Sequence, residues 1–204
     1  LTQWEYLFPK IVYNVDKIDN NSLEGTLSLK NELSVNRNLN KSYISLASSQ
    51  VDWNYQHVHR ATGILSNNEA NLRIISISID EKTSKDSNNM RFFPQISSKL
   101  SYPLLKSSPI INQTLTPILM PILAPYNNYT DSKAVTNSDL FSTNRATSIE
   151  EWESGPRVNY GLEWFISSKN NLDAKLVLGQ NYKLNKNNAD TNEELSDYFF
   201  NSSL

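Results

Sequence analysis

From residue 157 to residue 184 the sequence alternates apolar and polar side chains, a period of two that a β-strand produces and a helix does not. In the first segment one face carries Val158, Tyr160, Leu162, Trp164 and Ile166, and the other carries Arg157, Asn159, Gly161, Glu163 and Phe165. After Asn170 and Asn171 one face carries Leu172, Ala174, Leu176, Leu178, Tyr182 and Leu184, and the other carries Asp173, Lys175, Val177, Gly179, Asn181 and Lys183. The pattern predicts a hairpin of two long strands.

Composition extends this β interpretation to the whole chain of 204 residues. Only 38% of residues are hydrophobic and 20% are charged, so Asn, Ser and Thr supply much of the polarity, and these residues disfavour helices. The net charge of −2 argues against nucleic-acid binding, and the absence of cysteine excludes disulfides and thiol chemistry. Because the chain starts at LTQWEYLFPK, without a Met or a signal peptide, we expect it to be a fragment.

Further alternating or apolar segments lie upstream of the hairpin. We predict strands at Tyr6–Val15, Leu27–Val35, Tyr43–Val58, Asn71–Ile79, Phe92–Leu104 and Ile110–Ala124, which gives about eight long strands in all. Short connections near Lys106 and Asn170 alternate with long ones at Glu81–Met90, Tyr126–Pro156 and Asn185–Glu194, so the long loops should share one edge. Long amphipathic strands with this rhythm are typical of an outer-membrane β-barrel. We therefore expect an all-β antiparallel meander that forms part of a transmembrane barrel.

A set of short motifs in fixed order supports a more specific identification. The positions are Asp139, Leu140, Phe141, Asn144, Arg145, Arg157, Asn159, Tyr160, Gly161, Leu162, Gly179, Gln180 and Tyr182. This set resembles the lipopolysaccharide-assembly outer-membrane protein family LptD, also called OstA, mainly over residues 91–184. Ser148, Trp152 and Glu153 depart from the usual family pattern in the loop.

The resemblance implies a barrel in the outer membrane of a Gram-negative bacterium that inserts lipopolysaccharide (LPS) into the outer leaflet. It also implies a plug lipoprotein and periplasmic bridge proteins as partners, with no enzymatic activity and no cofactor. Residues 1–204 would then belong to one barrel domain, without the family's N-terminal periplasmic jellyroll domain. Because the family barrel is large and needs far more than eight strands, these strands should appear as an open sheet with two unpaired edges. In such a barrel Val158, Tyr160, Leu162, Trp164, Ile166, Leu172, Leu176 and Leu178 would face lipid, and Arg157, Asn159, Glu163, Asp173, Lys175, Asn181 and Lys183 would face the lumen.

Two other functions stay open from the residues alone. A porin or receptor-type barrel would pass solutes and show conductance, and a secreted β-sandwich would be a soluble binding module. Dependence on detergent separates the sandwich from both barrels.

Other groups of residues carry weaker signals. His57 and His59 point to the same side of a strand, but without a nearby carboxylate they favour a structural role over metal binding. We expect Glu150, Glu151 and Glu153 to form a solvated loop face, although they could bridge divalent cations. No catalytic arrangement is recognisable.

The long loop from Tyr126 to Pro156 should be ordered and fold inward over the barrel mouth. We expect Leu140, Phe141, Ile149 and Trp152 to pack together. Asp139 would pair with Arg145, and Asn144 would cap a turn.

Overall fold

The computed structural model describes residues 4–7, 10–18, 24–38, 43–80, 87–126, 140–145, 153–168, 173–184 and 198–203. These residues form eleven strands in one antiparallel sheet. The strands are β1 (Trp4–Leu7), β2 (Ile11–Ile18), β3 (Thr26–Asn38), β4 (Tyr43–His59), β5 (Ile64–Asp80), β6 (Ser87–Ser101), β7 (Leu104–Ser107), β8 (Ile111–Leu123), β9 (Arg157–Ser168), β10 (Asp173–Lys183) and β11 (Phe199–Ser203).

The strand order is β1-β3-β4-β5-β6-β8-β9-β10-β11, with β2 paired to β3 and β7 paired to β8. This confirms the expected antiparallel meander in an open sheet. The structure has three strands more than the eight or so expected. Two of the expected strands are each divided into two, and β11 was not predicted. The part of the chain that the structure describes contains no helix long and apolar enough to cross a membrane.

Contacts divide the chain into two compact units, residues 1–54 with 70–94 and residues 55–69 with 95–204. In the first unit β3 and β4 pair without a break from Thr26↔Asn54 to Arg37↔Tyr43. The expected strand Tyr6–Val15 is divided into β1 and β2, which both pair with β3. The sequence has Pro9 between them, and proline has no N–H for the ladder.

One face of the first unit carries a polar network. Arg73 Nε donates to Gln50 Oε1 at 2.7 Å, and Gln50 Nε2 donates to Asp52 Oδ1 at 2.7 Å. Lys30 Nζ lies 3.6 Å from Asp52 Oδ2, and Asn71 also donates to Asp52. The apolar partners Ile11 and Leu33, paired in register, are 60% and 53% exposed. The alternation therefore separates a polar face from an open apolar face.

Strands β6 and β7 are two halves of one strand. The pairs Ile96↔Leu123 and Leu104↔Leu115 keep the same register against β8, and Tyr102 N donates to Pro117 O at 3.1 Å between the halves. The interruption falls at Pro103, which cannot donate. The expected strand Phe92–Leu104 therefore starts earlier, at Ser87, and resumes after Pro103.

Two boundaries were wrong around β5 (Ile64–Asp80). The polar residues before Asn71 were expected to lie outside the strand but belong to it. Their side chains bond along and across the sheet, since Asn67 donates to Glu69 at 2.9 Å and Ser98 donates to Asn68 at 2.7 Å. The connection from Asp80 to Ser87 is also shorter than the long loop expected at Glu81–Met90.

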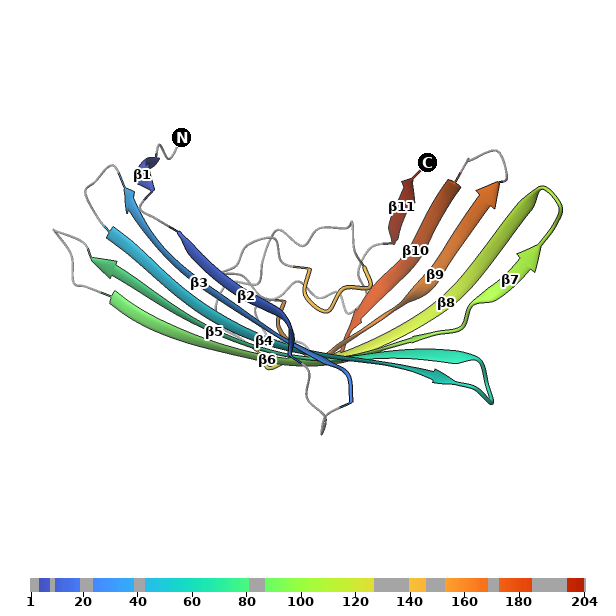
Figure 1. Cartoon of the computed structure of the whole chain (residues 1–204), viewed down its shortest axis with the longest axis horizontal. Coiled ribbons are helices and arrows are strands. Elements are labelled where there is room, and N and C mark those ends of the chain that lie inside the picture. Colours follow the sequence, from blue (N-terminus) through green and yellow to red (C-terminus); the bar gives the residue numbers. More distant parts are fainter. Residues whose placement is uncertain are drawn as a thin grey trace. The chain divides into compact units, whose positions relative to one another are not determined.

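Strands β8 to β11 lie side by side, from yellow-green to dark red in Figure 1. Register places Ile122, Arg157 and Lys183 in one row at one end of the strands. The β8–β9 and β10–β11 connections leave the sheet at this end. The β7–β8 and β9–β10 turns lie at the opposite end of the strands, where Ser107 pairs with Asn112 and Asp173 pairs with Ser167. Within the second unit the long connections therefore lie at the same end of the strands, as expected.

Candidate functional site: a loop docked on the polar face of β8–β10

Two pieces of the β8–β9 connection, residues 140–145 and 153–156, form what we term the docked loop. Leu140 and Phe141 pack into a buried cluster with Ile118, Met120 and Ile122 of β8. Leu140 and Phe141 thus belong to one packed cluster as expected, with β8 as their partner, whereas Ile149 and Trp152 lie outside the described residues.

A pair of glycines makes room for the loop. Gly161 of β9 stands directly opposite Gly179 of β10. A Cβ at Gly179 would lie 2.5 Å from Leu140 Cδ2, and a Cβ at Gly161 would lie 2.7 Å from Gly179 Cα. These two motif positions therefore need glycine because the strands and the Leu140 side chain approach so closely.

A buried cluster of three charges fastens the loop. Arg145 Nε donates to Glu153 Oε2 at 2.9 Å, with a second bond from its Nη2 to Oε1, and Arg157 Nη2 lies 3.1 Å from Glu153 Oε2. The three residues are 6%, 5% and 0% exposed in the order Arg145, Glu153, Arg157. The expected solvated acidic face is therefore wrong for Glu153, because two guanidinium groups draw its carboxylate inward. Arg145 pairs with Glu153, while Asp139, Glu150 and Glu151 lie outside the described residues.

Burial of Glu153 would raise the pKa of its carboxyl. The hydrogen bond from Arg145 and the positive charges of Arg157, Arg145 and Lys183 outweigh this effect, so the net pKa is below its ordinary value of 4.5. Glu153 is therefore ionised and holds two cations in the interior of the unit.

Backbone carbonyls of the loop complete the coordination of Arg157. Its guanidinium donates to Thr143 O at 2.6 Å, to Glu153 O at 3.1 Å and to Gly155 O at 3.4 Å. Thr143 O also accepts from Gln95 Nε2 at 2.7 Å, and Thr143 Oγ1 lies 2.9 Å from Ser97 Oγ and bonds Glu69. Thr143 lies in the loop and carried no signal in the sequence, and the only signal for Gln95 and Ser97 was a polar position on one face of β6.

Asparagines connect the loop to β9 and β10. Asn159 Nδ2 donates to Leu140 O at 2.6 Å, and Asn181 Nδ2 donates to Asn159 Oδ1. Both asparagines are fully buried. Asn144 Oδ1 accepts from Glu153 N at 3.2 Å and so joins the two loop pieces. The motif residues Leu140, Asn144, Arg145, Arg157, Asn159, Gly161 and Gly179 thus meet in one place.

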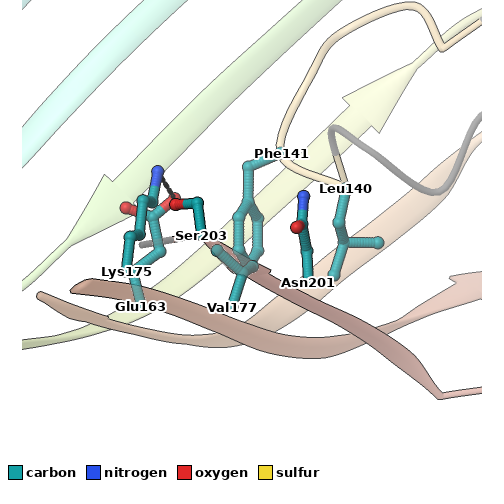
Figure 2. Close-up of a pocket in the computed structure, with 7 residues that line it drawn as sticks. All are labelled: Leu140, Phe141, Glu163, Lys175, Val177, Asn201 and Ser203. Atoms are coloured by element: carbon teal, nitrogen blue, oxygen red, sulfur yellow. Dashed lines mark ion pairs between the residues drawn. The ribbon is translucent and has the colours of Figure 1, made fainter.

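A small pocket borders the loop (Figure 2). It has a volume of about 100 Å³ and is lined by Leu140, Phe141, Glu163, Lys175, Val177, Asn201 and Ser203. Lys175 Nζ lies 3.5 Å from Glu163 Oε1, and the Phe141 ring points down towards Val177. The β11 residues Ser203 and Asn201 pair with Lys175 and Val177, so this missed strand supplies one wall.

The opposite face of the same strands is apolar and open. Leu119, Leu162, Trp164 and Leu178 are between 39% and 48% exposed. Tyr160 is also on this face, and its hydroxyl donates to Gln180 Oε1 at 2.7 Å. Val158, Ile166, Leu176 and Tyr182 share the face by register and are partly buried, and Leu172 lies outside the described residues. Asp173 and Lys183 are on the face of the loop, exposed and partly buried respectively.

The histidine pair stands at the β4–β5 turn. The rings of His57 and His59 are 4.6 Å apart edge to face, and Tyr55 stacks on His57 at 6.1 Å. Within the described residues no group of three His, Cys, Asp or Glu side chains could hold a metal ion. The structure thus places these side chains together as a ring cluster.

Comparison with known proteins identifies the family. A family model described as LPS transport system D (LptD) matches residues 4–203. No curated protein matches the chain. The matched family consists of transport and assembly proteins of the Gram-negative outer membrane that bind LPS and work within the Lpt complex. The motif residues that suggested this family also meet in one buried site. Because the match covers nearly all 204 residues, the chain belongs to the LPS transport system D family.

Proposed function

We propose that this chain is part of the wall of a single outer-membrane barrel domain that inserts LPS into the outer leaflet. The apolar face of β8–β10 contacts lipid, and the opposite face borders a wet lumen. The docked loop narrows the outer mouth of that lumen. A plug lipoprotein and periplasmic bridge proteins deliver the lipid to the barrel.

One observation carries the proposal, namely the division of β8–β10 into two faces. Leu162 and Trp164 are open to the surroundings, yet their strand neighbours Arg157 and Asn159 are fully buried under the loop. A soluble sheet would cover its apolar face and expose its polar face. The reverse arrangement is the one a bilayer stabilises, because lipid covers the apolar side.

The lipid-facing assignment is tested by a pair of arginine substitutions in the full-length protein. Leu162 and Phe165 are each 41% exposed on β9, on opposite faces. Leu162→Arg should cost about 1–3 kcal/mol, because Leu162 lies between the end of the apolar band and the bilayer midplane, whereas Phe165→Arg should be tolerated on the lumen side. The measurement is the folding free energy in lipid vesicles. Equal costs for the two variants would refute the assignment.

The transport function is tested by depleting the protein from cells and restoring it from a plasmid. Newly made LPS at the surface of intact cells, measured with an antibody, should fall on depletion and return on restoration. If depletion changed only the uptake of small solutes and left surface LPS intact, the porin alternative would replace this proposal.

A further inference from the structure

A second cavity lies on the open apolar face, away from the docked loop. It has a volume of about 450 Å³ and is lined by Leu104, Leu105, Lys106, Gln113, Leu115 and Trp164. Register aligns Leu104, Leu115 and Trp164 in one row across β7, β8 and β9, with Lys106 and Gln113 in the next row towards the β7–β8 turn. Directly opposite residues in antiparallel strands point to the same side, so these five side chains share the outer face.

The groove is apolar at one end and cationic at the other. Leu104, Leu115 and Trp164 form its apolar part, while Lys106 is exposed and forms no ion pair with any described residue. Gln113 stands beside Lys106 and offers an amide donor. A ligand that fits both ends has a hydrocarbon chain joined to an anionic headgroup.

The position of Lys106 along its strand places its positive charge at the membrane boundary. The apolar positions of β8 on this face run from Leu115 to Leu123, where Leu119 and Leu123 are 48% and 61% exposed. That run is about 27 Å along the strand, or about 20 Å along the bilayer normal at a tilt of about 40°. Trp164 therefore stands one row before Ile166 at the end of the apolar band, where barrels carry aromatic girdles. Lys106 lies in the row of Ile166, from which its long side chain reaches the headgroup layer.

The lengths of the turns indicate which leaflet of the membrane the groove faces. The β7–β8 and β9–β10 turns are short, and both lie at the end of the strands opposite the long connections. In outer-membrane barrels short turns are periplasmic and long loops are extracellular. The groove therefore opens to the periplasmic leaflet, which in a Gram-negative outer membrane consists of glycerophospholipid.

We propose that this groove is a binding site for an anionic glycerophospholipid of the periplasmic leaflet. This inference rests on the proposed function, because it requires the outer face to contact lipid. One acyl chain lies against Leu104, Leu115 and Trp164, and the phosphate accepts hydrogen bonds from Lys106 and Gln113. A zwitterionic headgroup fits less well because its own ammonium group is repelled by Lys106.

Trp164 lies in the groove and can report the lipid beside it. The full-length protein is reconstituted in phosphatidylcholine vesicles with a small fraction of phosphatidylglycerol or phosphatidylethanolamine, both with brominated acyl chains that quench tryptophan. The difference between the wild-type protein and Trp164→Phe isolates the signal of this residue from that of the other tryptophans. We expect phosphatidylglycerol to be enriched about fivefold over phosphatidylethanolamine, the effect of about one lysine near an anionic headgroup.

Substitutions connect the preference to the groove. Lys106→Gln should reduce the fivefold ratio to about one. Lys175→Gln removes a positive charge from the opposite face, where Lys175 pairs with Glu163, and should leave the ratio unchanged. An unchanged ratio in Lys106→Gln would overturn the role of Lys106.

The remaining outcomes separate this inference from the proposed function. Equal quenching by both brominated lipids would overturn the anionic site and leave the lipid-facing wall intact. Absence of any Trp164 quenching would overturn the wall assignment itself. Displacement of brominated phosphatidylglycerol by a much smaller fraction of LPS than of unbrominated phosphatidylglycerol would assign the groove to LPS and overturn the glycerophospholipid site.

Discussion

Removal of the single negative charge from the buried cluster is the most direct test of how the loop is held. Glu153→Gln preserves size and a carbonyl acceptor but leaves Arg145 and Arg157 without their shared counter-charge. Because Arg157 is 0% exposed and Glu153 is 5% exposed, water cannot readily replace the lost carboxylate. Breaking a buried ion pair by removing one partner costs about 3–5 kcal/mol. The loop should therefore open more often by about 150-fold to several thousand-fold.

Hydrogen exchange measured by mass spectrometry on the full-length protein in lipid nanodiscs reports this opening directly. Peptides covering residues 140–156 should exchange faster in Glu153→Gln by that factor, while peptides from β9 and β10 keep their rates. Glu163→Gln is the matched control, because Glu163 also accepts from a cation but its pair with Lys175 is partly exposed, at 26% and 47%. That control should cost less than about 1 kcal/mol.

Two results would refute this reasoning. An acceleration below about tenfold in Glu153→Gln would mean that water reaches the cluster and screens the charges. An equal acceleration in Glu163→Gln would mean that loop opening depends on general charge and not on the buried cluster.

Three further predictions concern the same site. Because the folded-state pKa of Glu153 lies below its ordinary value of 4.5, the stabilisation it gives is present above that value and is lost as the pH falls through the folded pKa. The difference in loop-opening free energy between the wild-type protein and Glu153→Gln should thus be constant from about pH 7 to 5 and shrink in acid, and a difference that grows in acid would contradict the assignment. Gly161→Ala would press a Cβ against Leu178 O and Gly179 Cα and should destabilise the barrel in vesicles by about 1–3 kcal/mol, against less than about 0.5 kcal/mol for Ser167→Ala on the same strand. Deleting residues 139–151 should raise the permeability of cells to bulky antibiotics, with deletion of residues 187–193 from the other long connection as the control; unchanged permeability in correctly inserted protein would leave the motif as a folding element.

Alternation along the chain was sufficient to place most of the strands and to determine which side chains share a face. The sets around Leu162 and Asn159 were separable from sequence because strand side chains alternate regardless of what surrounds them. Interruptions within strands were harder to predict from the sequence. Pro103 divides one strand into β6 and β7, and only the pairing of both halves with β8 shows that they keep one register. β11 carried too short an alternating signal in FFNSS to be recognised.

Tertiary structure alone determined how the loop is held. Nothing local indicates that Arg145 chooses Glu153, or that Thr143 O accepts hydrogen bonds from both Arg157 and Gln95, because those partners meet only after β6, β8 and β9 pair. The same holds for Gly161 and Gly179, whose need for glycine comes from the approach of two strands and the Leu140 side chain. Sequence thus determined the two faces of the sheet, which depend on a local period, whereas the partners on the buried face depend on contacts between residues far apart in the chain.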